Sequence, residues 1–136
     1  MQNRWCWILI GSLGVAAGPL AQPLDETIER WRGGDRTGAL AAWRAMAQQG
    51  DAEASLFLGY AYRNGLGVGR DYARAARWYR LAAEHGEPEA QYELALMYEL
   101  GLGVAQDADE AAAWYGRSAL QACPAELTAG GRLGDR

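Results

Sequence analysis

The sequence predicts an all-helical protein, a short right-handed α/α solenoid built from helix–turn–helix repeats. Three observations predict it: an internal repeat with a period of 36 residues, apolar residues at helical spacing, and cap-forming residues between the helices. Shifting the sequence by 36 residues aligns 50–85 with 86–121 without a gap, and the tetrapeptide GLGV recurs at the same place in both units. A period of this length is typical of proteins whose repeats stack in a row.

Each unit reads as two antiparallel helices. In the first helix the shared apolar positions recur every four residues, at Ala54, Leu58 and Tyr62, and in the second they keep helical spacing from Ala75 to Ala83. Each helix therefore turns one apolar stripe toward a common core. We expect the repeat core to contain Leu58, Tyr62, Trp78 and Tyr79, with their equivalents Leu94, Tyr98, Trp114 and Tyr115.

The predicted helix ends carry residues with capping chemistry. A carboxylate just before a helix accepts hydrogen bonds from free backbone amides, and Asp51, Asp71 and Asp107 hold such positions. Asp107 and Glu110 also have the spacing of a capping box. Pro88 suits a first helical turn, because its missing N–H would be unpaired there anyway. GLGV ends each first helix, since glycine adopts backbone angles that other residues resist.

A weaker copy of the unit lies upstream, at 23–49. The same offset pairs Asp35 with Asp71 and Trp43 with Tyr79. We expect a degenerate first repeat here, with a first helix over 23–32 and a turn at its two consecutive glycines. The predicted array then holds six helices in three stacked hairpins.

The N-terminal residues 1–21 have the pattern of a signal peptide. No charged residue occurs between Arg4 and Asp25, and the run is apolar at first and then rich in small residues. Cleavage after Ala17 or Ala21 would fit, and an uncleaved membrane anchor is the alternative, weakened by glycines and a proline. Cleavage would remove Cys6 and leave Cys123 without an intrachain partner, either as an unpaired thiol or as an intermolecular bridge.

The residue types argue against several functions. The chain has 17 acidic and 13 basic residues, whereas nucleic-acid binders usually carry a basic excess. His85 is the one histidine, and its place at the end of a predicted helix is explained by the helix dipole. No nucleophile–base set and no zinc ligand set can be assembled from these residues. We therefore expect no enzyme activity, no metal and no cofactor.

The repeat motifs resemble those of the Sel-one-like repeat family, relatives of the tetratricopeptide repeats, whose own period is about 34 residues. The resemblance covers 50–121 strongly and 23–49 loosely, and it rests on Ala54, Leu58-Gly59, Tyr62, GLGV, Asp71, Ala75, Trp78-Tyr79 and Ala82-Ala83 with their copy. It implies an α-solenoid whose concave face is lined by the first helix of each unit. It also implies an adaptor or scaffold role.

Two main classes of function stay open, beside a purely structural role. The first is an exported protein–protein interaction module of the bacterial cell envelope, periplasmic or secreted, that binds a protein or peptide on its concave face. The alternative is an envelope hydrolase of the β-lactamase or penicillin-binding type claimed for some cysteine-rich relatives. Those relatives carry paired cysteines in their repeats and this chain does not, so the binding module is the prediction.

Two groups of side chains are candidate partner-binding sites. On the first helices, Glu53, Phe57, Glu89 and Glu93 depart from the shared apolar pattern. Phe57 is either a binding hot spot or a packing residue against the first hairpin. On the second helix of unit one, Arg70, Arg74, Arg77 and Arg80 fall on one side. They form either a patch for an acidic partner or membrane phosphates, or a solvated face with an Arg80–Glu84 pair.

The C-terminal tail, 122–136, is too short and too rich in glycine for another hairpin. Pro124 would stop the last helix, and Leu127 and Leu133 could fold back over its apolar side. Without such a cover the open end would favour weak self-association, which Cys123 could lock.

Overall fold

In a computed structural model the described residues, 24–122, form six α-helices and no strand. The helices are α2 (Leu24–Arg32), α3 (Arg36–Gln48), α4 (Ala52–Asn64), α5 (Tyr72–Glu84), α6 (Pro88–Leu100) and α7 (Ala108–Ala122). The six predicted helices are thereby confirmed. The predicted signal peptide and most of the tail, with both cysteines, lie outside the described residues.

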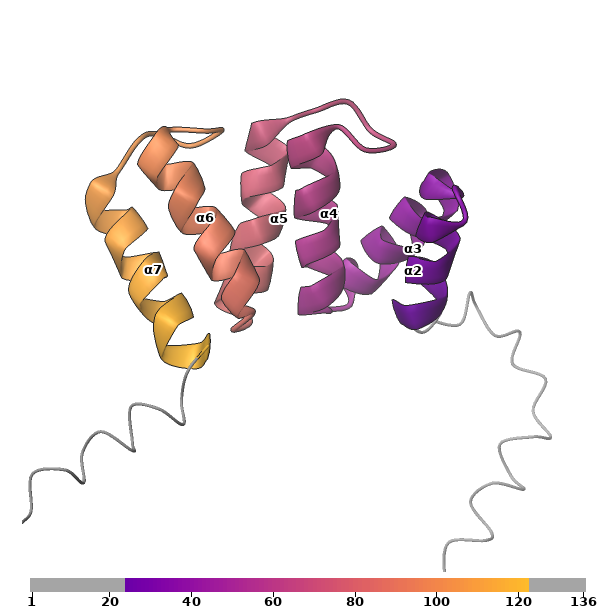
Figure 1. The fold of residues 1–136 in the computed structure, drawn as a ribbon, viewed down its shortest axis with the longest axis horizontal. Coiled ribbons are helices and arrows are strands. Elements are labelled where there is room, and N and C mark those ends of the chain that lie inside the picture. The colour runs from indigo at the N-terminus through magenta and orange to yellow at the C-terminus, as the bar shows by residue number, and fades with distance from the viewer. Residues whose placement is uncertain (1–23, 123–136) are drawn as a thin grey trace, which may run out of the picture.

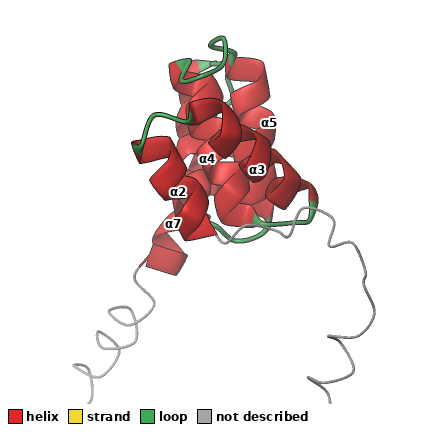
Figure 2. Cartoon of the chain, turned by 90° about the vertical axis from the view of Figure 1, so that its right-hand side faces the viewer, coloured by secondary structure: helices red, strands yellow, loops and turns green. Residues whose placement is uncertain are grey.

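The helices form three antiparallel hairpins that follow one another in a row, α2–α3, α4–α5 and α6–α7 (Figure 1). The turns within the hairpins α4–α5 and α6–α7 lie at one end of the stack, and the turns between hairpins lie at the other (Figures 1 and 2). Helix α5 contacts both α4 and α6, so it joins the second hairpin to the third. This is the predicted all-α solenoid.

The helix ends follow the predicted chemistry with one exception. The carboxylate of Asp51 accepts from the amide of Ala54 at 2.9 Å, and Gly65 ends α4 in the left-handed conformation at φ 67°. Asp107 Oδ1 accepts from the amide of Glu110 at 3.1 Å. The reciprocal half of the capping box is absent, because the N–H of Asp107 donates to the carbonyl of Tyr98 at 3.0 Å.

The predicted core residues are buried to different degrees. Leu58, Leu94 and Tyr79 are fully buried, and Tyr62 and Trp114 are nearly so. Trp78, Tyr98 and Tyr115 are only partly buried and pack at the edge of the core. Two apolar clusters result. One joins α4 through α7, and the other packs α3 against α4 with side chains of α2 along its edge.

Helices α4 and α5 approach each other closely at Gly59. A Cβ atom on Gly59 would lie 2.6 Å from Cδ1 of the Tyr79 ring, which is too close for any real contact. The ring is fully buried, so it can give way only by displacing its neighbours. Glycine at 59 is therefore a packing requirement.

This contact gives a stability prediction with an internal control. Gly59→Ala should destabilise the protein by about 1–3 kcal/mol, because the added methyl overpacks the core against Tyr79. Gly116→Ala should stabilise it by about 0.5–1 kcal/mol, since alanine favours the helix and a Cβ there meets nothing within 4 Å. Urea unfolding monitored by circular dichroism measures both. Equal effects of the two changes would contradict the packing argument.

Candidate protein-binding surfaces

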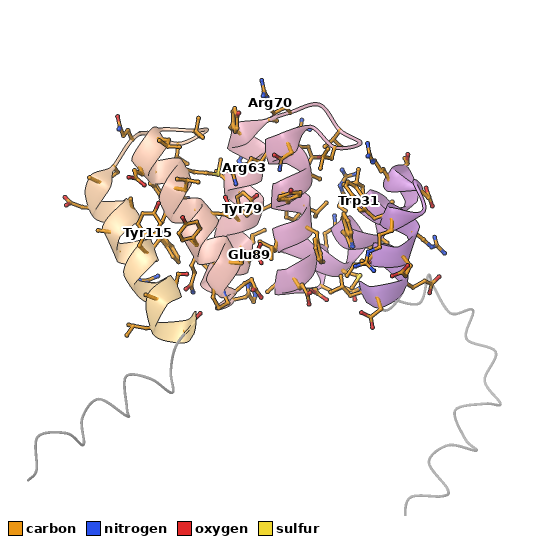
Figure 3. All side chains as sticks on the ribbon, viewed as in Figure 1. Trp31, Arg63, Arg70, Tyr79, Glu89 and Tyr115 are labelled. Atoms are coloured by element: carbon orange, nitrogen blue, oxygen red, sulfur yellow. The ribbon has the colours of Figure 1, made fainter. Side chains whose placement is uncertain are left out.

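The first surface is the first-helix face, the side of the stack formed by α2, α4 and α6. An apolar pocket of about 120 Å³ opens on it between α2 and α4. The lining side chains are Ile28, Trp31, Trp43, Phe57 and Tyr60. Tyr60 stands at the rim with 51% of its surface exposed. Trp31 projects from the α2–α3 hairpin on the side of α4 (Figure 3).

An aromatic stack holds the wall of this pocket. The centre of the Trp43 ring lies 5.0 Å from that of Phe57 at an interplanar angle of 20°, and 5.0 Å from that of Trp31 at 39°. Trp43 Nε1 donates to Thr27 Oγ1 at 2.7 Å, and this hydroxyl donates to the carbonyl of Leu24 at 2.7 Å. Both polar groups of this buried pair are thereby satisfied. Phe57 packs against the first hairpin and also lines the pocket.

Carboxylates gather near the starts of the first helices. Glu53 and Glu89 are exposed at equivalent positions of α4 and α6. Partial burial raises the pKa of Glu53, and the negative charges of Glu87, Asp51 and Asp25 raise it further. The carboxylates of Glu87, Asp51 and Asp25 around Glu53 place negative charge here that would favour a cationic partner.

Glu93, the fourth residue predicted for this face, is already engaged. It forms an ion pair with Arg63 of α4, and only 19% of the Glu93 side chain is exposed. The pair lies beside Tyr79, whose pKa is raised by burial and by Glu93 and partly lowered by Arg63. Arg63 and Tyr79 both lie in the middle of the stack (Figure 3). Glu93 thus links α4 to α6.

The structure distributes the four predicted arginines over a loop and two neighbouring grooves. Arg70 precedes α5 and sits in the loop, with its guanidinium 5.5 Å from the centre of the Tyr72 ring. Arg74 and Arg77 line a groove of about 520 Å³, and Arg80 lines the next groove along the stack. Arg77 and Arg80 also line one smaller pocket of about 190 Å³ between the two grooves. The expected Arg80–Glu84 ion pair is not formed, because Arg80 donates to the hydroxyl of Tyr98 instead.

The groove that holds Arg74 and Arg77 also contains residues that sequence reasoning missed. Its remaining lining consists of Arg44, Tyr62, Trp78 and Leu81. Arg44 comes from α3, in the preceding hairpin, and donates to the Tyr62 hydroxyl at 3.1 Å. The offset of 36 residues pairs Arg44 with Arg80 and could have drawn attention to it.

His85 lies at the C-terminal end of α5. His85 Nδ1 lies 2.7 Å from the carbonyl of Leu81, in the last turn of α5. Within residues 24–122, no three histidine, cysteine or acidic side chains cluster closely enough to hold a metal ion. None of the described helices is long and apolar enough to cross a membrane.

The last described helix leaves aromatic groups partly uncovered. Tyr115 donates to Glu99 Oε2 at 2.7 Å, and burial together with this carboxylate raises the pKa of Tyr115 to about 12. Its ring lies 5.3 Å from Tyr92, and Leu120 is 64% exposed. Leu127 and Leu133, the expected cover, lie outside the described residues. Self-association at this end stays a prediction.

Comparison with known proteins decides the family. The Sel1 repeat model matches the chain twice, at residues 52–87 and 88–123. The chain belongs to the Sel1 repeat family. The two matches begin two residues later than the units of the self-alignment, and they keep the predicted period. A comparison with curated proteins finds no match.

Solved structures of Sel1 repeat proteins are similar to this chain. A Sel1 repeat protein from Oxalobacter formigenes is 35% identical with a TM-score of 0.60, over 61% of this chain and 63% of that one. The protective antigen c5321 of uropathogenic Escherichia coli strains, which displays an SLR fold, is 40% identical with a TM-score of 0.60, over 61% of this chain and 18% of that one. Cysteine rich protein B of Helicobacter pylori shares the fold at 16% identity, with a TM-score of 0.63 over 76% of this chain and 92% of that one.

Family membership carries a general function. Sel1 repeat proteins are typically protein–protein interaction modules without catalytic activity. This Sel1 repeat chain spans less than two thirds of the Oxalobacter protein and about a fifth of the Escherichia coli antigen.

The raised pKa of Glu53 predicts a pH-dependent stability difference. A carboxyl whose pKa is higher in the folded than in the unfolded state destabilises the fold as pH rises through that pKa. Glu53→Gln should therefore melt slightly above the parent at about pH 7, and the difference should vanish below about pH 4, near the unfolded pKa. Water screens an exposed carboxylate, so the effect is small. Thermal melts at both pH values measure it, with Glu89→Gln as the control for net charge. A difference that persists unchanged in acid would contradict the assignment.

Proposed function

We propose that this Sel1 repeat protein is an exported adaptor of the bacterial cell envelope that holds a protein segment on its first-helix face. The observation that carries the proposal is the apolar pocket between α2 and α4, with carboxylates at nearby helix starts. The partner segment presents an apolar side chain to the pocket. It also presents a lysine or arginine to the carboxylates around Glu53.

The pocket has the properties of an interface hot spot. Such sites are enriched in aromatic side chains and take an anchor residue of the partner. Here Trp43 and Phe57 are fixed by stacking, so little ordering entropy opposes binding. Tyr60 adds a half-exposed ring with a polar hydroxyl, a side chain favoured at interfaces. The carboxylates orient a basic segment as it approaches and raise its association rate.

Tyr60, and not Phe57, gives the clean test of this surface. Removing the Phe57 ring would also remove its stack on Trp43, so lost binding could follow from a loosened first hairpin. The Tyr60 ring is half exposed and lines only the rim of the pocket. Tyr92 on α6 has the same exposed fraction, 51%, and does not line the pocket.

A displayed random peptide library, selected on the purified chain, should yield peptides that combine an aromatic or aliphatic residue with lysine or arginine. Tyr60→Ala should weaken their binding by about tenfold or more, the loss typical of a hot-spot residue. Tyr92→Ala should bind like the parent. Both variants should keep the parent's helical circular dichroism. Selected peptides that are acidic, or that bind Tyr60→Ala unchanged, would contradict this site.

The export part of the proposal rests on the charge-free N-terminal run. Intact-mass measurement of the protein from a bacterial envelope fraction should find a chain that begins between Gly18 and Pro23. Replacing the apolar residues Ile8, Leu9 and Ile10 by aspartate should leave the full chain in the cytosol. Recovery of a chain that starts at Met1 from wild-type cells would contradict cleavage.

A further inference from the structure

The second helices of the stack frame two equivalent grooves with opposite charge. The first lies between α3 and α5, and the second lies between α5 and α7. Both grooves share three residues, which we call the frame. An arginine of one helix donates a hydrogen bond to the hydroxyl of a tyrosine on the next helix, and a tryptophan lines the wall. The frame residues are Arg44, Tyr62 and Trp78 in the first groove and Arg80, Tyr98 and Trp114 in the second.

The remaining residues give the two grooves opposite charges. In the first groove Arg74 and Arg77 join Arg44, so three guanidinium groups line it. One repeat later, Glu110 stands at the position of Arg74 and Ala113 at the position of Arg77. The second groove is lined by Glu84, Asp107 and Glu110 against its single arginine. Because the same fold forms with glutamate and alanine at these two positions, the extra arginines of the first groove are not required by the repeat.

The charges of the first groove are poorly neutralised within the chain. Neither Arg44 nor Arg77 has a carboxylate within 4.0 Å among residues 24–122. Arg74 has one at 3.4 Å, from Asp71, and both side chains are exposed to water. The guanidinium groups of Arg44 and Arg74 are both directed to Tyr62, one by a hydrogen bond and the other 5.7 Å from the centre of the ring.

The same groove offers apolar contact. Trp78 is only partly buried, and 41% of the Leu81 surface is exposed. One repeat later, α7 carries Arg117 at the position equivalent to Leu81. A ligand for the first groove therefore combines negative charge with an apolar side chain.

We propose that the groove between α3 and α5 binds an acidic peptide segment. Carboxylates of the segment pair with Arg44 and Arg77, whose planar guanidinium groups match carboxylate geometry. An apolar side chain of the segment packs on Trp78 and Leu81. An anionic membrane fits less well, because the acidic groove of the next repeat lies beside the basic one and would be repelled by the surface. This site is separate from the first-helix face and takes a ligand of opposite charge.

The test uses a fluorescein-labelled peptide in which glutamates flank one leucine, with binding followed by fluorescence anisotropy. The full chain should bind the peptide with a dissociation constant in the range of about 10–100 µM. In about 0.5 M salt the peptide should dissociate, because salt screens the charges. Arg44→Gln and Arg77→Gln should each weaken binding by about tenfold, the loss expected for one charged hydrogen bond. Replacing the peptide's leucine by serine should weaken binding as well.

The matched control is Arg80→Gln, which removes the equivalent arginine and its hydrogen bond to tyrosine from the acidic groove. It should leave peptide binding within about twofold of the parent. Equal weakening by Arg44→Gln and Arg80→Gln, or no binding by the parent, would overturn the proposal. Binding to phosphatidylglycerol vesicles in preference to the peptide would also overturn it. Tyr60→Ala should not change binding of the acidic peptide, which keeps this result independent of the first-helix face.

Discussion

The packing of Tyr79 against the backbone of α4 is the contact on which the stack depends. A hairpin of two short helices cannot bury its apolar stripes alone, so it needs its neighbours. The ring of Tyr79 comes from α5, meets α4 where Gly59 has no side chain, and shares one cluster with Leu94 and Met97 of α6. One fully buried ring of α5 thus couples two hairpins, and the Arg63–Glu93 pair beside it joins the same two hairpins through α4 and α6.

The position that Tyr79 holds in its repeat has a different environment in each of the three hairpins. In the first hairpin it is Trp43, which is 2% exposed and stacks on Phe57. In the second it is Tyr79, closed in by the next hairpin. In the third it is Tyr115, which is partly buried and packs beside Tyr92.

The frame residues of the two grooves recur with the repeat, whereas the exposed residues around them differ. The arginine–tyrosine bond and the tryptophan wall recur in both grooves of the second helices. The residues that decide what each groove attracts lie on the exposed side of the same helices, where substitution costs little stability. A chain with two full repeats can therefore carry surfaces of opposite charge: acidic around Glu53, basic around Arg77, and acidic again beside Asp107.

The sequence by itself determined the hairpins, their period and most of their ends, because local rules govern these features. Helical spacing marks the stripes, and aspartate, proline and glycine act within a few residues of the ends they define. Only the tertiary structure decided the partners of long polar side chains. Arg80 turns to Tyr98 and not to Glu84, Glu93 pairs with Arg63, and Arg44 enters a groove with arginines of the next hairpin. Long flexible side chains reach atoms of neighbouring helices, and the distances to those atoms are set by how the hairpins pack, which spacing along one helix does not encode.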